Sequence, residues 1–270
     1  MTIYKEVTFL CQSLYKNKRL IGEMAKRDIS DRYAGQILGI FWAIAHPVIM
    51  IAAYVFLFAV VFRAKTEGVV DVPGDHTLYM LSGLIPWLVV ADVLGRSSAL
   101  ISSQASLVKQ VVFPVEVLPV KMVLATLPTF VIGLAGILIY AAVVDRISAS
   151  MILFLVAALP LYLFLLGCAF LLSAVGIFLR DVKELTQLYT MIGLFIAPIF
   201  YFIDWVPEKI RLILYANPLT FYIEAFHDAA YYGEIRSWLV WCMVFVLSLI
   251  MLSIGMAVFA RLKPQFGSYL

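Results

Sequence analysis

Long apolar runs constrain the fold of this chain more than any other feature of its sequence. They recur from Ile37 to Ala260 and are separated by short charged segments. Runs of about 20 mainly apolar residues are typical of transmembrane helices. Charged residues make up 14% of the sequence, whereas soluble domains contain about 25%. The sequence therefore predicts an all-α integral membrane protein.

Six membrane spans are predicted. A helix rises about 1.5 Å per residue and the hydrocarbon core is about 30 Å thick, so the first run is long enough to cross it with some tilt. We expect residues 1–36 to precede a single transmembrane domain formed by residues 37–270. The predicted spans cover about residues 37–62, 78–100, 114–144, 151–179, 185–203 and 238–260.

The segment before the first span has two parts. In residues 1–21, apolar residues recur at helical spacing, which predicts a basic amphipathic helix on an anionic membrane surface. Residues 22–36 alternate in charge sign and include Arg27, Asp28 and Arg32. This second part is equally compatible with a solvated entry turn and with a docking surface for a partner protein.

Polar residues gather around the end of the second span. A charge at the bilayer centre costs roughly 2.5–3.5 kcal/mol, so Asp92 and Arg96 should lie at the headgroup level, with pairing at i, i+4 as a supplement. The stretch from Ser97 to Gln110 is too polar to span but has apolar residues at helical spacing. We therefore expect a short helix across the membrane face here.

The segment from Trp205 to Gly233 interrupts the pattern of spans. Its charged residues leave no apolar run long enough to cross a membrane. We expect it to dip into the membrane and return as two short re-entrant helices, separated where Pro218 restricts Asn217 to extended geometry. The span before it, at residues 185–203, should be kinked at Pro198.

The distribution of Lys and Arg predicts the orientation of the chain. With six spans both termini lie on one side, and that side carries thirteen Lys and Arg residues against six on the other. The termini and the segments Ser97–Gln110 and Arg180–Glu184 are therefore predicted to be cytoplasmic. The segment 205–233 is predicted to face outward.

Motifs for catalysis are missing from the sequence. A phosphate-binding loop of the form GxxxxGK[ST] is absent, as are HExxH and GxSxG. Cys11, Cys168 and Cys242 are too widely spaced to suggest a metal site or a disulfide framework. We expect no enzyme activity, no cofactor and no nucleic-acid partner for this chain, so ATP-driven transport would require another chain to hydrolyse ATP.

Aromatic residues form a stripe on the first span. Tyr54, Phe58 and Phe62 recur every four residues on one helix face. Such a stripe more often packs against protein or lies at the membrane interface than stacks on carbohydrate.

Four stretches occur in an order and at spacings that are specific when taken together. They are DRYAGQILGIFWAIAHPVIM (Asp31–Met50), LVKQVVFPVEVLP (Leu107–Pro119), LRDV (Leu179–Val182) and NPLTFYIEAFHDAAYYG (Asn217–Gly233). Through them nearly the whole chain resembles the membrane-spanning permeases of type-2 ABC exporters for bacterial surface polysaccharides. The resemblance is greatest to O-antigen exporters and extends to teichoic-acid and capsule exporters.

The resemblance implies a homodimer in the bacterial inner membrane that binds two copies of a cytoplasmic ATPase, which holds ATP and Mg²⁺. Its expected substrate is a surface polysaccharide linked to a polyprenyl diphosphate, carried from cytoplasm to periplasm. ATPase coupling is expected from Arg27, Asp28, Arg32, Ser97, Ser103, Leu107, Lys109, Arg180 and Asp181. Channel lining is expected from Tyr54, Phe58, Phe195 and Tyr201. An outer gate is expected from Trp205, Pro207, Asn217, Pro218, Glu224 and Asp228.

Two positions depart from the pattern of such permeases. Val115 stands where a basic residue is usual, and Gln110 stands where a second Lys is common. These departures leave Lys109 and Lys121 as the local cations for a lipid diphosphate.

Three other functions remain open. A small-molecule or drug exporter of the same type would need a narrower apolar cavity. An ion-coupled transporter needs ionisable residues in the middle of its spans, whereas those of this chain fall toward span ends. A membrane-embedded transferase could use Glu224, His227 and Asp228, but no nucleophile or phosphate-binding loop accompanies them.

Overall fold

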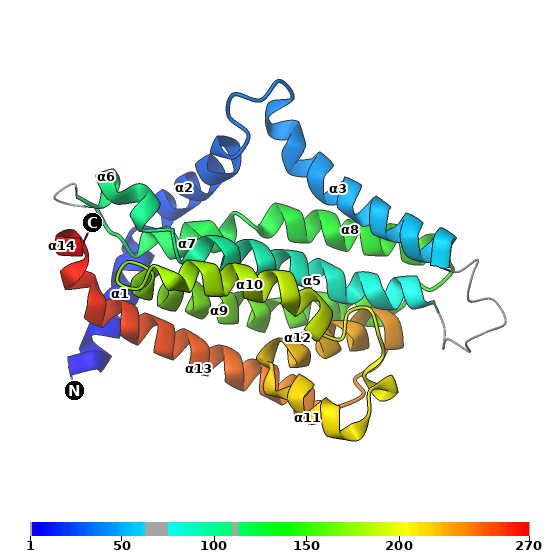
Figure 1. Cartoon of the computed structure of the whole chain (residues 1–270). Helices are drawn as coiled ribbons and strands as arrows, with labels where there is room; N and C mark the ends of the chain where they lie inside the picture. Colours follow the sequence, from blue (N-terminus) through cyan, green and yellow to red (C-terminus); the bar gives the residue numbers. More distant parts are fainter. Residues whose placement is uncertain (1, 63–74, 110–112, 270) are drawn as a thin grey trace.

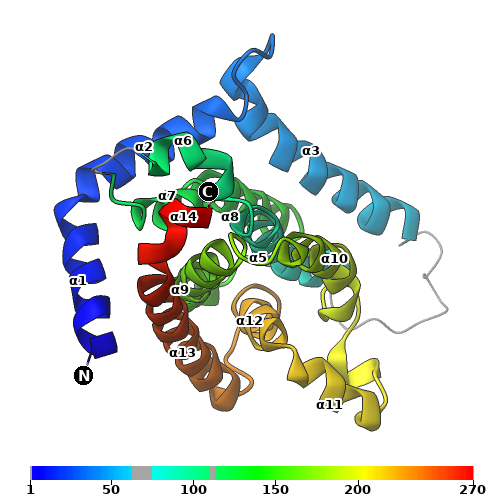
Figure 2. The same ribbon diagram turned by 60° about the vertical axis from the view of Figure 1, so that its left-hand side comes forward.

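The structure, a computed structural model, describes residues 2–62, 75–109 and 113–269, and within these ranges every regular element is helical (Figure 1). Helices α5, α8, α9 and α10 run roughly side by side, with α5 in the middle of the bundle, whereas α3 is inclined to them at the edge (Figures 1 and 2). The helices of the bundle are α3 (Trp42–Val55), α5 (His76–Ser97), α7 (Val117–Leu124), α8 (Leu127–Val143), α9 (Ile152–Val175), α10 (Asp181–Ile196) and α13 (Trp238–Leu262).

Five helical stretches in the described residues are long and apolar enough to cross a membrane. They correspond to five of the six predicted spans. Their bounds are Gly39–Val61, His76–Ser97, Val117–Val143, Ala149–Val175 and Trp238–Tyr269.

The remaining predicted span, at residues 185–203, differs from the prediction. Helix α10 has 16 residues, or roughly 24 Å, which is shorter than a hydrocarbon core of about 30 Å. It ends at Ile196, because Pro198 restricts Ala197 to the extended conformation that is observed (φ −68°, ψ 142°). The prediction of one helix kinked at the proline is therefore wrong. The helix begins earlier, at Asp181, and stops before Pro198.

Helices α9 and α13 pack with their backbones in contact. A Cβ atom added to Gly255 would lie 2.1 Å from the carbonyl oxygen of Gly167. Small residues of this kind let membrane helices approach closely. Ser248 of α13 also donates a hydrogen bond to the carbonyl of Pro160 in α9 (2.6 Å). These two helices therefore form a rigid pair.

Both termini lie at the same end of the molecule, together with α1 (Thr2–Lys16), α6 (Ala105–Val108) and α14 (Phe266–Tyr269) (Figure 1). A second N-terminal helix, α2 (Lys18–Asp31), follows α1 and packs against α7. The charged segment therefore remains helical to Asp31, and the predicted entry turn is confined to the residues that follow.

Two short helices lie at the opposite end (Figure 1). We call α11 (Glu208–Ala216) and α12 (Pro218–His227) the hinge helices. Asn217 separates them in the extended conformation that Pro218 requires (φ −83°, ψ 114°). Its side-chain oxygen accepts a hydrogen bond from Leu219 N (3.1 Å) and so caps α12. This break is at the position that the sequence predicts.

Candidate functional site

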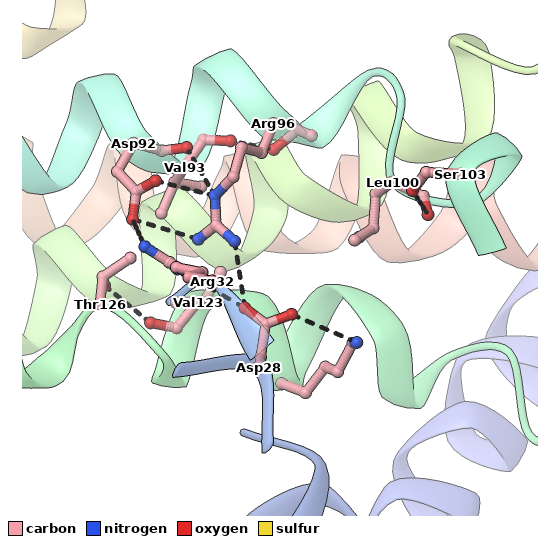
Figure 3. Close-up of polar contacts among 11 residues, drawn as sticks. Asp28, Arg32, Asp92, Val93, Arg96, Leu100, Ser103, Val123 and Thr126 are labelled. Atoms are coloured by element: carbon pink, nitrogen blue, oxygen red, sulfur yellow. Dashed lines mark hydrogen bonds and ion pairs between the residues drawn. The ribbon is translucent and has the colours of Figure 1, made fainter. Parts of the chain in front are cut away.

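Five charged side chains meet where α2, α5 and α7 approach one another, and we call them the ion cluster (Figure 3). Arg32, at the end of α2, lies 3.0 Å from the carboxylate of Asp92 on α5. Arg96 on α5 lies 3.1 Å from the carboxylate of Asp28 on α2. Each arginine thus contacts a carboxylate of the other helix, and this crossed pairing fixes α2 against α5. The members of the ion cluster are Asp28, Arg32, Asp92, Arg96 and Lys121.

The ion cluster is largely removed from solvent. The side chain of Lys121 is 6% exposed, and its Nζ lies 3.3 Å from Asp28 Oδ1. Burial alone would raise the pKa of Asp28, but Arg96, Lys121 and Arg32 outweigh burial and hold this pKa below its usual range. Removing one partner from such a group leaves a buried charge unpaired, which is strongly destabilising.

Within the ion cluster, Asp92 and Arg96 pair directly. Arg96 Nε lies 2.8 Å from Asp92 Oδ1, one helical turn away. The i, i+4 pairing that the sequence indicates is therefore present. Lys121, one of the two local cations noted in the sequence, is buried and pairs with Asp28.

Glu116 makes a second buried contact at the same end, immediately before α7. It is 1% exposed. Ser13 of α1 donates a hydrogen bond to Oε1 (2.5 Å), and Lys263, just after α13, donates one to Oε2 (2.7 Å). Burial alone would raise the pKa of Glu116, but the bonds from Lys263 and Ser13 hold it below its usual range. One carboxylate thus connects the N-terminal helix and the last long helix to α7.

The residues predicted to couple to an ATPase fall into two groups. Asp28 and Arg32 are occupied in the ion cluster, and Leu107 packs partly against the core. Ser97 is fully buried and donates to the carbonyl of Val93 (2.6 Å). The last turn of α5 thus encloses this side chain, and the role of Ser97 in ATPase coupling stays a prediction.

The other predicted coupling residues are exposed at or near the end that holds the termini. Arg27 pairs across one turn with Asp31 (3.4 Å) on the outer face of α2. The remaining exposed members are Ser103, Lys109, Arg180 and Asp181. Gln110 lies outside the described residues.

At the opposite end, His227 anchors α12 to two other segments. It is 1% exposed. Its Nε2 lies 2.9 Å from the carbonyl oxygen of Pro198, in the break after α10, and its Nδ1 lies 2.8 Å from Ser82 Oγ on α5. Its ring stacks on Tyr79 with centroids 3.7 Å apart. Burial lowers the pKa of His227 to about 3 and so keeps the ring neutral.

The predicted gate residues lie on or beside the hinge helices. Pro207 is exposed directly before α11, and Trp205 packs edge-on against Phe202 with ring centroids 4.8 Å apart. Asp228 Oδ2 accepts a hydrogen bond from Trp241 Nε1 (3.0 Å). Glu224 Oε1 accepts one from the Tyr215 hydroxyl (2.8 Å). The structure thus brings Glu224 and Asp228 together on one helical segment, where they line one cavity.

The predicted channel residues gather around Phe200, which sequence reasoning missed. The rings of Tyr54 and Phe58 lie 6.0 and 5.6 Å from that of Phe200. Phe195 lies 6.2 Å from it and is 66% exposed. Tyr201 is apart from this group, since its hydroxyl donates to the carbonyl of Ile196. The signal that could have identified Phe200 is its place in the aromatic run that follows Pro198.

The buried polar contacts at both ends hold helices in place. Within the described ranges, no group of three or more His, Cys, Asp or Glu residues could hold a metal ion. Both ring nitrogens of His227 have partners, so the ring is occupied in anchoring the helix. Asp28, Glu116 and His227 each tie a peripheral helix to the central bundle. They are positioning residues.

Comparisons with known proteins show the family of this chain. The family described as "ABC-2 type transporter" matches residues 19–231. An O-antigen export system permease protein RfbA from Klebsiella pneumoniae is 27% identical over 259 residues, which cover 93% of this chain and 95% of that protein. The RfbA protein of Myxococcus xanthus is 27% identical over 214 residues, covering 78% of this chain and 80% of that protein.

A capsule polysaccharide export inner-membrane protein, CtrC of Neisseria meningitidis, is 22% identical over 268 residues, covering 96% of this chain and 98% of that protein. These similarities extend through the ion cluster, the hinge helices and nearly all the long helices. The chain therefore belongs to the ABC-2 type transporter family, as a multi-pass membrane permease homologous to the permeases of O-antigen and capsule polysaccharide export.

Proposed function

We propose that this chain is the membrane subunit of an ATP-driven exporter that moves a polyprenyl-diphosphate-linked surface polysaccharide, such as O-antigen, from cytoplasm to periplasm. The observation that carries the proposal is the ion cluster. It joins a peripheral N-terminal helix to the central helix α5 at the end opposite the hinge helices. A displacement of α2 by a partner would therefore move α5, which also contacts α12.

Six membrane crossings fit this function. Helix α10 lies beside α5 and, together with the extended residues after it, would complete the sixth crossing. The excess of Lys and Arg at the end that holds both termini favours a cytoplasmic location for that end. The hinge helices would then re-enter the membrane from the periplasmic side and serve as the outer gate.

Two copies of a cytoplasmic ATPase would dock on the end that holds the termini. Exposed residues are available there, including Arg27, Ser103, Lys109 and Arg180. ATP and Mg²⁺ would be bound by that partner. This chain would convert the movement of the ATPase subunits into movement of its own membrane spans. Among the exposed cations there, Lys109 is the one that we assign to a lipid diphosphate. If Lys109→Ala left export and glycan-stimulated ATP hydrolysis unchanged, we would drop that role.

A second copy of this chain would complete the channel. Only 17% of the apolar window of the first span is buried within one chain. Large apolar side chains such as Ile49 of α3 and Phe195 of α10 are exposed, and the rings of Tyr54 and Phe195, one from each helix, both lie beside that of Phe200. The proposed channel wall consists of Tyr54, Phe58, Phe195, Phe200 and Tyr201.

Deletion of the chain tests the function in cells. We expect loss of the surface polysaccharide and accumulation of its lipid-linked form on the cytoplasmic face, both restored by the wild-type chain. Normal surface polysaccharide in the deletion strain would sink the proposal. The alternative of a small-molecule exporter instead predicts normal polysaccharide and increased drug sensitivity.

A further inference from the structure

A cavity of about 440 Å³ lies between the hinge helices, the start of α13 and the first turn of α5. Its volume falls within the range of small-molecule sites, about 300–1,000 Å³. Its walls combine aromatic side chains, including Tyr215, Phe221 and Tyr232, with charged groups such as Glu224 and Arg236. This mixture differs from the apolar core of the bundle and is typical of a binding site for a polar ligand with apolar faces.

Glu224 is incompletely hydrogen-bonded. Its Oε1 accepts from the Tyr215 hydroxyl, but the buried Oε2 has no hydrogen-bond partner in the described part of the chain. An unsatisfied buried oxygen of this kind is unfavourable. Because Glu224 borders the cavity, a ligand hydroxyl in the cavity is the partner that would satisfy it.

The neighbouring charges distinguish between ligand classes. Asp228 is already satisfied by Trp241 Nε1 and by the backbone N–H of Arg236. The Arg236 guanidinium lies 4.2 Å over the ring of Tyr232 and 3.7 Å from Asp204. A cation fixed beside the carboxylates disfavours a metal ion. A neutral polyol can use both the carboxylate and the guanidinium.

We propose that this cavity binds a short segment of a hydroxyl-rich saccharide. Glu224 accepts a sugar hydroxyl, Arg236 donates to sugar oxygens, and the aromatic walls contact the C–H faces of the sugar ring. The proposal rests on the proposed function, which supplies the glycan. It adds a specific contact for that glycan between the hinge helices and α13.

The test is equilibrium binding of the host's own surface polysaccharide, freed of lipid and labelled, to the exporter complex purified with its ATPase subunit. We expect Glu224→Gln to weaken binding roughly tenfold, because one of the two acceptor oxygens becomes an amide NH₂ group, which cannot accept a hydrogen bond from the sugar hydroxyl. Phe221→Leu should weaken it severalfold, because the aromatic face is lost while the side chain stays apolar. The matched control is Glu208→Gln, which changes an exposed glutamate at the start of α11, outside the cavity. Its affinity should equal that of the wild type.

Thermal unfolding and co-purification with the ATPase subunit establish that each variant is folded. If Glu224→Gln does not fold, the binding measurement on Phe221→Leu tests the site. Absence of binding to the wild type, or equal affinity for wild type and both cavity variants, would overturn the site. Loss of affinity in Glu208→Gln equal to that in Glu224→Gln would overturn it as well. Failure of the proposed function is separate, because it appears as normal surface polysaccharide in cells without the chain.

Discussion

The two ends of the molecule are held together by different chemistry. At the end with both termini, α2 is joined to the bundle by the ion cluster, in which Asp28 faces three cations. At the other end, α12 is joined to α5 and to the break after α10 by His227, through neutral hydrogen bonds and a stack on Tyr79.

The difference follows from the surroundings of each contact. The ion cluster retains some contact with solvent, since the arginines are about a quarter to a third exposed. Charges can be kept there if each has a partner. His227 is enclosed on all sides, where a charge would be costly. The end that holds the termini therefore depends on charge pairing, and the end that holds the hinge helices depends on packing and neutral hydrogen bonds.

The largest expected effect comes from removing the carboxylate at the centre of the ion cluster. Asp28→Ala should lower the free energy of unfolding by about 3–5 kcal/mol, because Lys121 and Arg96 lose their buried partner. Chemical unfolding of the purified protein in detergent measures this loss. A loss below about 1 kcal/mol would contradict the idea that charge pairing holds this end.

Removing the neutral anchor should have a somewhat smaller effect. His227→Ala should destabilise the protein by about 2–4 kcal/mol, since two hydrogen bonds and the contact with Tyr79 are lost. Hydrogen exchange should increase in α12 and in the break around Pro198. Equal exchange in these segments in the variant and the wild type would show that His227 does not fix the hinge helices.

Acidification should weaken the contacts at the two ends at different pH values. The pKa of His227 is lowered, so its contribution is present above about pH 6.5 and is lost as the pH falls below that value. The pKa values of Asp28 and Glu116 are also lowered, so their contributions persist until the pH falls below about 4. Between pH 6.5 and pH 4, the contact made by His227 should therefore weaken while those of Asp28 and Glu116 persist.

The measurement is the stability of the wild type relative to His227→Ala from pH 7 to 5. The difference in free energy of unfolding between the wild type and His227→Ala should decrease by up to about 1.4 kcal/mol per pH unit below pH 6.5. Burial raises the pKa of Glu224 to about 7, so the contribution of this residue to stability increases as the pH falls. This contribution is the same in the wild type and in His227→Ala and does not affect their difference. A constant advantage over this range would refute the neutral anchor.

The smallest effect is expected for the exposed ion pair on α2. Arg27→Gln should change the free energy of unfolding by less than about 0.5 kcal/mol, because Arg27 and Asp31 are both largely in solvent. The same unfolding measurement checks it. A loss comparable with that of Asp28→Ala would mean that position on α2, rather than burial of the charge, determines the effect.

Local patterns in the sequence predicted much of the fold. Five of the six spans were found from apolar runs, and the break at Asn217 from the proline that follows it. The pairing of Asp92 with Arg96 follows from their spacing on one helix. Each of these features depends on residues close together in the chain.

Features that depend on distant residues could not be predicted in this way. Nothing near Lys121 indicates that it lies against Asp28, and nothing near His227 indicates Ser82 as its partner. The end of α10 was misjudged because the apolar run continues through Pro198 to Ile203, although the backbone leaves the helix. Hydropathy alone does not distinguish an apolar helix from an apolar extended segment.

The most direct test of the account is ATP hydrolysis by the complex of this chain with its ATPase subunit, reconstituted in lipid nanodiscs. We expect a lipid-linked surface polysaccharide to change the rate of hydrolysis by the wild-type complex. Asp28→Asn should reduce this response, because the charged contact of Asp28 with Arg96 is lost and only the Arg32–Asp92 pair still joins α2 to α5. An equal rate with and without the lipid-linked polysaccharide, or a full response in Asp28→Asn, would contradict the account.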